Sequence, residues 1–476
     1  MNRTVKYCVG LFILLMLIYG LTAYNVTISN DSCTNIEQIV EGDIFKRSSH
    51  FSFNFLGVVF YKAVSILGVC NPIYSTQFML ALFSALGSIA LFLVTLKRSL
   101  SFQIAVLAAL IYAFSSNVWR FSLQSEYLVL VPSLGLIACA YWTYGRWFFG
   151  GVFFALALLT SPFALFILPF AYPDIFRINR RQIMFGLLGF SMIYGFVSYF
   201  TFEETLTGEW SYNLVYTYYA KAIESMMPTR IFSIWAYGYM RSFHVLMPFF
   251  LMAMWKTWRQ NRMLFLVTSL GVIIHLPAAI PEIRYGAYQM TFYPFIASIV
   301  AVHIVYLNRR SRTMAFAAFI LYSMFNAYIV LEERMFKRQL AETYTALQND
   351  ASIPDSSTVL MYQATKPLNT VYATRLNGVA IYSAYQEKLT DNLERYELPD
   401  YAKISENNRI VYLIESGTSM PDDKLKLLIS NFVKNQGAKL KGFGMEKAKE
   451  MYSTATFELL PGYSIPVYKL TLPRSE

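Results

Sequence analysis

Residues 31–50 read DSCTNIEQIVEGDIFKRSSH and separate one apolar segment of the chain from a long series of them. This stretch holds Asp31, Glu37, Glu41 and Asp43, although charged residues make up only 14% of the chain. A group of acids between apolar segments has two interpretations. It is either a loop that is simply hydrated, or the chemical centre of a membrane enzyme. The rest of the sequence has to distinguish the two.

The composition divides the chain into two regions. The 476 residues are 56% hydrophobic and 17% aromatic, whereas soluble domains are about half apolar and about a quarter charged. Up to about residue 335 the sequence consists of apolar runs close to the length of about 20 residues that a helix needs to cross hydrocarbon. Beyond that point it has an ordinary globular composition. The sequence therefore predicts a polytopic α-helical membrane protein, with a transmembrane domain at 1–335 and a small α/β domain at 336–476.

The basic residues predict the orientation of the chain. Its net charge of +11 would suit nucleic acid, but Lys and Arg stand at the ends of apolar runs, which is the positive-inside pattern of a membrane protein. No nucleic-acid partner is expected. Arg3 and Lys6 then place the N-terminus in the cytoplasm and the loop 25–73 outside. This count gives about eleven crossings and an extracytoplasmic C-terminal domain.

Several elements follow from the same pattern. The segment 51–69 is interrupted by Lys62, which favours an interfacial helix. The segment 148–172 contains Ser161-Pro162, and we expect it to break there. The expected spans are 9–24, 74–96, 102–119, 127–144, 148–172, 183–200, 235–255, 263–280, 290–307 and 313–331. A charged helix begins the C-terminal region at about Glu332, followed by strand-like runs at 358–362, 409–414 and 463–472 and a helical run at 422–435.

The first loop holds the strongest candidates for chemistry. If residues 35–45 are helical, Glu37 and Glu41 stand one turn apart on one face. Neighbouring carboxylates raise the pKa of one of the two, towards the range useful for a general base. The alternative is a solvated helix on the bilayer surface. His50 either orients a carboxylate or is a boundary residue.

Two further polar links face the same side. The link Gln124-Ser125-Glu126-Tyr127 offers a carboxylate, for which capping of a helix is the alternative. Arg284-Tyr285 offers a guanidinium that suits phosphate oxygens, with a surface salt bridge to Glu282 as the alternative. No His or Cys cluster has the spacing of a zinc site, so no cofactor is predicted, although the acids leave a divalent metal open. Cys33 and Cys70 could pair in an oxidising compartment.

The order of these features resembles the GT-C superfamily of integral-membrane glycosyltransferases, especially the bacterial relatives of protein O-mannosyltransferases and aminoarabinose transferases. The resemblance rests on the acids from Asp31 to Asp43, on the Gln124–Tyr127 link, and on Arg284-Tyr285 with Pro294. It implies a sugar donor carried on polyprenyl phosphate, an acceptor that is a lipid, a glycan or a protein, and a site in a bacterial inner (plasma) membrane.

The resemblance also implies roles for these residues. Glu37 or Asp43 would be the catalytic base, and Asp31 and Glu41 would be supporting acids. Arg284 and Tyr285 would bind the phosphate, while Glu126 and His50 would shape the substrate site. One feature departs from the family, because His50 is followed by Phe51-Ser52-Phe53 where the family has prolines.

The rival interpretation is a transporter or flippase for a lipid-linked saccharide, or a non-catalytic assembly partner. A transporter predicts inverted repeats and charges near the middle of its spans. The sequence shows no clear repeat, and its charges lie at the ends of the spans. His275 is the exception, although a lone polar residue in a span can also bridge two helices.

Overall fold

The computed structural model describes most of the apolar region and parts of the C-terminal region. The described residues are 3–24, 30–42, Ile44, 50–68, 71–175, 179–200, 236–260, Arg262, Ser269, 288–353, 358–361, 377–380, 411–414 and 456–471. The chain divides into two compact units. The first comprises 1–25 and 38–333, and the second comprises 26–37 and 334–476. Each is described by itself.

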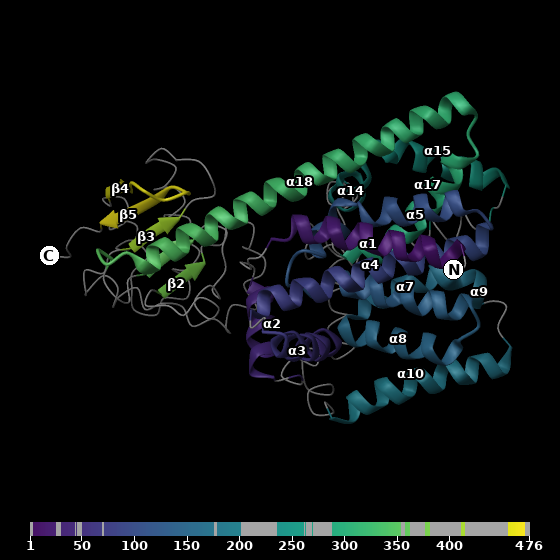
Figure 1. Ribbon diagram of the computed structural model, residues 1–476, viewed down its shortest axis with the longest axis horizontal. Helices are drawn as coiled ribbons and strands as arrows, with labels where there is room; N and C mark the ends of the chain where they lie inside the picture. Colours follow the sequence, from purple (N-terminus) through teal and green to yellow (C-terminus); the bar gives the residue numbers. More distant parts are fainter. Residues whose placement is uncertain are drawn as a thin grey trace, which may run out of the picture. The chain divides into compact units, whose positions relative to one another are not determined.

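The first unit is a bundle of helices, shown in purple to teal in Figure 1. Neighbouring helices follow the order α10, α8, α7, α4, α5 and α17, with α1 against α4 and α3 against both α4 and α8. The helices of the bundle are α1 (Arg3–Thr22), the last turn of α2 (Asn30–Glu41) from Gln38 onward, α3 (Phe51–Ile66), α4 (Pro72–Ser99), α5 (Phe102–Ala113), α6 (Ser116–Phe121), η2 (Tyr127–Val129), α7 (Leu130–Thr143), α8 (Trp147–Thr160), η3 (Pro162–Ile167), α9 (Leu168–Ile175), α10 (Arg180–Phe200), η4 (Ala236–Met240), α14 (Arg241–Phe243), η5 (His244–Leu246), α15 (Met247–Gln260), η6 (Tyr288–Thr291), α17 (Tyr293–Val305) and the first part of α18 (Arg309–Asn349).

Local sequence signals explain where these helices begin. The side chain of Asn71 accepts hydrogen bonds from the amides of Ile73 and Tyr74, and Pro72 occupies the first helical position of α4. Such a cap satisfies amides that a helix start leaves without partners. Ser161 and Pro162 do the same between α8 and η3. The break expected at Ser161-Pro162 is therefore confirmed.

Two expected spans are interrupted in the structure. The segment 102–119 was expected as one helix, but α5 ends at Ala113 and α6 begins at Ser116. Ser115 stands between them with an extended backbone, and its hydroxyl donates to the carbonyl of Tyr112. That bond lets a serine compete with the helix for a backbone group. The segment 235–255 is also divided, into a π-helical turn, two short turns and α15.

The last expected span and the charged helix after it form one element. Helix α18 runs over 41 residues without interruption, and its sequence contains no glycine or proline that would stop it. It appears in Figure 1 as the long green helix. Its first part belongs to the first unit and its remainder to the second.

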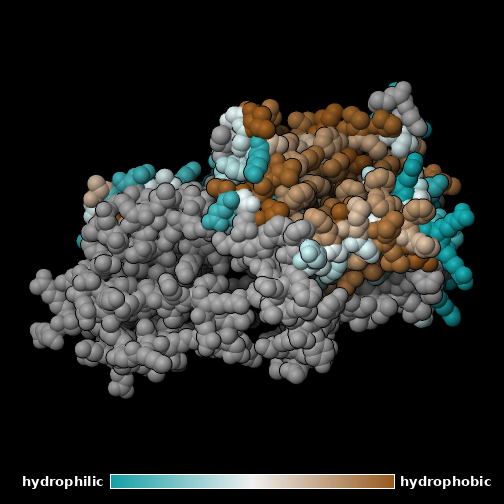
Figure 2. Space-filling view, turned by 90° about the horizontal axis from the view of Figure 1, so that it is seen from below, coloured by the Kyte–Doolittle hydropathy of each residue, from teal (hydrophilic) through white to brown (hydrophobic). Residues whose placement is uncertain are grey.

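The surface of the bundle is apolar. Figure 2 shows hydrophobic residues over much of the visible face of the helices, with hydrophilic residues towards its edges. Met184, Leu188 and Phe196 of α10 are among the large apolar side chains that are exposed. Four of the described helices, α1, α4, α10 and α18, are long and apolar enough to cross a membrane. The prediction of a polytopic helical membrane protein is confirmed at this level.

Two glycines let α8 and α10 approach each other closely. A Cβ atom added to Gly151 would collide with the carbonyl oxygen of Gly186 and lie 2.9 Å from the amide nitrogen of Phe190. One added to Gly189 would collide with the carbonyl of Phe148. Small residues at such crossings allow backbones to pack where no hydrophobic effect drives association.

The described part of the second unit contains a five-stranded sheet with the order β2-β1-β3-β5-β4. Strand β1 is parallel to β2 and β3, while β5 is antiparallel to β3 and β4. The strands are β1 (Thr358–Met361), β2 (Asn377–Ala380), β3 (Val411–Ile414), β4 (Thr456–Leu460) and β5 (Val467–Thr471). Within this unit the hydroxyl of Thr343 on α18 accepts a hydrogen bond from the amide of Ile465 over 3.1 Å, and Asp350, the residue after α18, accepts one from the Tyr463 hydroxyl over 2.7 Å. The end of α18 therefore holds the connection between β4 and β5. The expected helical run at 422–435 lies outside the described residues.

Candidate functional site

The helices of the bundle place basic and polar residues at opposite ends. At one end the guanidinium of Arg3 lies 4.7 Å from the ring centre of Phe102, which joins the start of α1 to the start of α5. Lys97 and Arg98 are in the last turn of α4, which ends there. At the other end, where α1 finishes, the indole of Trp119 donates to the hydroxyl of Thr22 over 3.0 Å. The polar groups described next belong to this second end.

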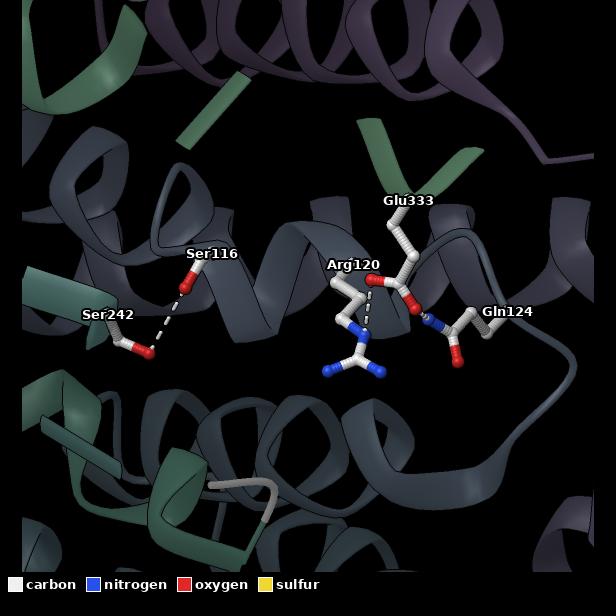
Figure 3. Close-up of polar contacts among 5 residues, drawn as sticks. All are labelled: Ser116, Arg120, Gln124, Ser242 and Glu333. Carbon is white, nitrogen blue, oxygen red and sulfur yellow. Dashed lines mark hydrogen bonds and ion pairs between the residues drawn. The ribbon is translucent and has the colours of Figure 1, made fainter. Parts of the chain in front are cut away.

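Arg120, Gln124 and Glu333 form one ion-paired cluster, which we call the α18 clamp (Figure 3). The Nε atom of Arg120 lies 2.7 Å from Oε2 of Glu333. The amide of Gln124 donates to the other carboxylate oxygen, Oε1, over 3.2 Å. The arginine and glutamate side chains are only 14% and 17% exposed. This pair is therefore screened less by salt than one on the surface.

Tyr24 lies beside the clamp, just beyond the end of α1. Its side chain is fully buried. Burial raises the pKa of Tyr24 well above the usual value of 10.0, and the negative charge of Glu333 raises it further, while Arg120 acts in the opposite direction. The hydroxyl is therefore neutral at physiological pH.

His50 is held in a defined orientation at the start of α3. Its Nδ1 atom lies 3.0 Å from the carbonyl oxygen of Thr160, at the end of α8. A carbonyl oxygen can only accept, so Nδ1 of His50 carries a proton and donates it to Thr160. The imidazole also stacks on Tyr127, with ring centres 3.6 Å apart. His50 therefore contacts the Gln124–Tyr127 link through Tyr127, the residue that follows Glu126.

The first part of the acidic stretch forms helix α2, and the last turn of that helix, from Gln38 onward, packs on α3. Gln38 accepts a hydrogen bond from Asn54 over 2.9 Å, and a Cβ atom added to Gly57 would collide with Ile39. These contacts turn Gln38 and Ile39 towards α3, while Glu41 in the last turn is exposed.

The other predicted site residues divide into three groups. Asp31 and Glu37 lie on α2, but only their backbone is described; Glu37 and Glu41 are one helical turn apart, as expected. Asp43, Arg284 and Tyr285 lie outside the described residues, as do Cys70 and His275. Glu126 stands at the N-terminal end of η2, as expected for the residue that heads this helix, and its side chain makes no capping hydrogen bond.

The sequence did not point to Arg120 or Glu333 as partners. A signal was present, because Arg120 is a basic residue in a link assigned to the outer side, where the positive-inside rule makes it an exception. A cation there needs a compensating anion, and Glu333 follows the last expected span, at the end predicted to face the same side. Among the residues that the structure describes, no group of three His, Cys, Asp or Glu side chains is arranged to hold a metal ion.

Comparison with known proteins identifies the fold. No protein family model and no curated protein sequence matches the chain. Among solved structures, it is similar to ArnT from Cupriavidus metallidurans, both bound to undecaprenyl phosphate and in the apo state. Identity is 11%, 98% of each chain is covered, and the TM-score is 0.59. It is also similar to an oligosaccharyltransferase from Archaeoglobus fulgidus, at 12% identity and a TM-score of 0.51, over 96% of this chain and 72% of that one. The chain has the fold of the GT-C glycosyltransferases, as the resemblance in its sequence implied.

Proposed function

We propose that the protein is a membrane glycosyltransferase that moves a sugar from a polyprenyl-phosphate donor to an acceptor at the outer face of the membrane. The observation that carries this proposal is the likeness to ArnT along 98% of both chains. One of those ArnT structures is bound to undecaprenyl phosphate, which makes a polyprenyl phosphate the expected lipid partner here.

The proposed orientation follows from the two ends of the bundle. The end with Arg3, Lys97 and Arg98 would face the cytoplasm, and the end with the α18 clamp and His50 would face outward. The C-terminal α/β domain would then be extracytoplasmic, and the full chain would make about eleven crossings of a bacterial inner membrane. An outward site suits a donor whose lipid tail remains in the bilayer while its sugar lies at the interface.

The proposed reaction is a single displacement at the anomeric carbon. A carboxylate takes the proton of an acceptor hydroxyl or amine while the acceptor oxygen or nitrogen attacks the anomeric carbon, and Glu37 and Asp43 are the candidates for this carboxylate. The bond from the anomeric carbon to the phosphate oxygen breaks, and the polyprenyl phosphate leaves with the electron pair. One displacement inverts the configuration of the sugar. Arg284 is the candidate for steadying the phosphate charge, with Asp31 and Glu41 as supporting acids.

The test replaces each first-loop acid by its amide. The four single variants are Asp31→Asn, Glu37→Gln, Glu41→Gln and Asp43→Asn. Membranes carrying each variant are supplied with a panel of undecaprenyl-phosphate-linked sugars, and the release of undecaprenyl phosphate is measured. Loss of a general base typically costs about 10²- to 10⁴-fold in rate. Glu332→Gln, which changes an exposed acid of α18, is the matched control.

The outcomes separate an enzyme from its rivals. We expect one of the four amide variants to lose release while the control retains it. If the wild-type protein releases no undecaprenyl phosphate but moves the intact donor across a liposome membrane, the chain is a flippase. If neither occurs, the interpretation as a non-catalytic partner takes the place of the proposal.

A further inference from the structure

The link between α6 and η2 is buried, which is unusual for a connection between helices. Ser122, Gln124 and Ser125 are at most 4% exposed. Buried connections have to satisfy their polar groups internally, because water does not reach them. Ser122 does so within the bundle, through bonds to the carbonyl of Val118 and the hydroxyl of Ser84. Gln124 does so through Glu333, on a helix that comes much later in the chain.

The carboxylate of Glu333 holds this link at two points. One oxygen lies 2.7 Å from Nε of Arg120, near the end of α6, as an ion pair, and the other accepts a hydrogen bond from the amide of Gln124, four residues further along. Figure 3 shows both side chains converging on the carboxylate. The turn between Arg120 and Gln124 is therefore fixed by an anion supplied from α18.

Helix α18 is a rigid support for that anion. On the same helix the hydroxyl of Tyr322 donates to the carbonyl of Ile111 over 2.7 Å. One turn later, Asn326 is hydrogen bonded to His244 over 3.1 Å. Together with Glu333, these residues bind the first part of α18 to three different segments of the bundle. The helix cannot slide or rotate without breaking these bonds.

We propose that Glu333 is a positioning residue of the transfer site and that it acts through Arg120 and Gln124. The clamp sets the turn from which Glu126 and Tyr127 emerge, and Tyr127 in turn stacks on His50. Helix α18, which comes late in the chain, thus determines the geometry of the link between α6 and η2. This inference rests on the proposed function, because it concerns residues of the proposed transfer site.

The experiment measures donor turnover in membranes with the full-length protein, again as release of undecaprenyl phosphate from undecaprenyl-phosphate-linked sugars. Rates are expressed per amount of folded protein, which is quantified by size-exclusion chromatography in detergent. Glu333→Ala and Arg120→Ala should each lower kcat by about 10- to 100-fold, the cost of a misplaced catalytic constellation. KM for the donor should change little, because a geometry needed only in the transition state affects kcat. Glu332→Gln on the same helix should leave kcat unchanged.

Two combined variants distinguish positioning from general loss of structure. The exchange R120E/E333R restores the ion pair, and Gln124 can turn its amide oxygen towards the new guanidinium, so kcat should recover in large part. A double-mutant cycle combines Glu333→Ala with Tyr127→Leu. Because both residues act on one link, the double variant should lose less kcat than the product of the two single losses.

Three results would overturn the proposal. The first is that the losses multiply fully in the double variant. The second is that Glu333→Ala retains wild-type kcat per folded protein. The third is that the wild type releases nothing from any donor, in which case the proposed function fails as well. Wild-type turnover combined with either of the first two results removes the positioning role alone.

Discussion

Replacing Gly151 with alanine tests the closest helix crossing of the bundle. An added Cβ atom would lie 2.9 Å from the amide nitrogen of Phe190, at least half an ångström short of ordinary van der Waals contact, and would collide with the carbonyl oxygen of Gly186. Backbone atoms on both sides cannot turn away as a flexible side chain can. The two helices have to separate, and overpacking of this kind costs about 1–3 kcal/mol. The higher helix propensity of alanine compared with glycine recovers only about 1 kcal/mol of this overpacking cost.

The matched control for this crossing is Gly195 on α10. Its neighbourhood is open, with no atom within 4 Å of an added Cβ. Gly195→Ala should therefore leave the melting temperature unchanged or raise it. Gly151→Ala should lower it by about 1–2 °C, because an unfolding entropy of about 2.1 cal/mol/K per residue over 476 residues makes each kcal/mol worth about 1 °C; the melting temperature is measured by tryptophan fluorescence of the protein in detergent. Equal melting temperatures for the two variants would show that α8 and α10 do not approach as described.

Two further predictions concern buried tyrosines. The hydroxyl of Tyr293 accepts a hydrogen bond from Asn117 over 2.7 Å and donates to the carbonyl of Gly238. Tyr293→Phe should therefore destabilise the protein by about 1–3 kcal/mol, whereas Tyr306→Phe, at an exposed position, should not. Equal thermal unfolding of the two variants would contradict this hydrogen-bond network. Because the pKa of Tyr24 is higher in the folded protein than the ordinary 10.0, the unfolded chain ionises first and stability falls as pH rises above about 10. Tyr24→Phe should lessen that fall in melting temperature between pH 8 and pH 11, and an unchanged fall would contradict the assigned burial.

The sequence predicted best where a local signal exists. Ser161-Pro162 contains both a capping side chain and a proline, and the break expected there is where η3 begins. Asn71-Pro72 carries the same signal, and α4 begins there, two residues before the start expected for the span 74–96. The break at Ser115 had only a serine within an apolar run, and serines also occur inside helices of membrane proteins. Whether such a serine interrupts the helix depends on the packing around it, which a single sequence does not contain.

The candidate site shows the same contrast between residues with a local sequence signal and residues that depend on tertiary packing. The 124–127 link and His50 stood out as polar groups at the ends of apolar runs, and the structure brings Tyr127 and His50 into contact. The clamp did not stand out, because its partners come from distant segments and each has an unremarkable local sequence. Arg120 and Glu333 become a pair only when α18 lies against α6, a contact that depends on tertiary packing.

The length of α18 explains why an ion pair is placed at Glu333. A helix rises 1.5 Å per residue, so Glu333 lies about 36 Å along the axis from Arg309. The hydrocarbon core is about 30 Å thick. If Arg309 marks the cytoplasmic boundary, Glu333 falls just beyond the opposite one, where a charge costs far less than at the centre of the bilayer. Water and headgroups still reach this zone, yet neighbouring side chains leave the pair less than a fifth exposed. The pair is therefore neither fully desolvated, which would cost several kcal/mol, nor fully solvated, which would make it worth little. In the proposed orientation, the charge of Arg120 is neutralised by Glu333 at this depth, and Arg120 can still direct the link that follows it.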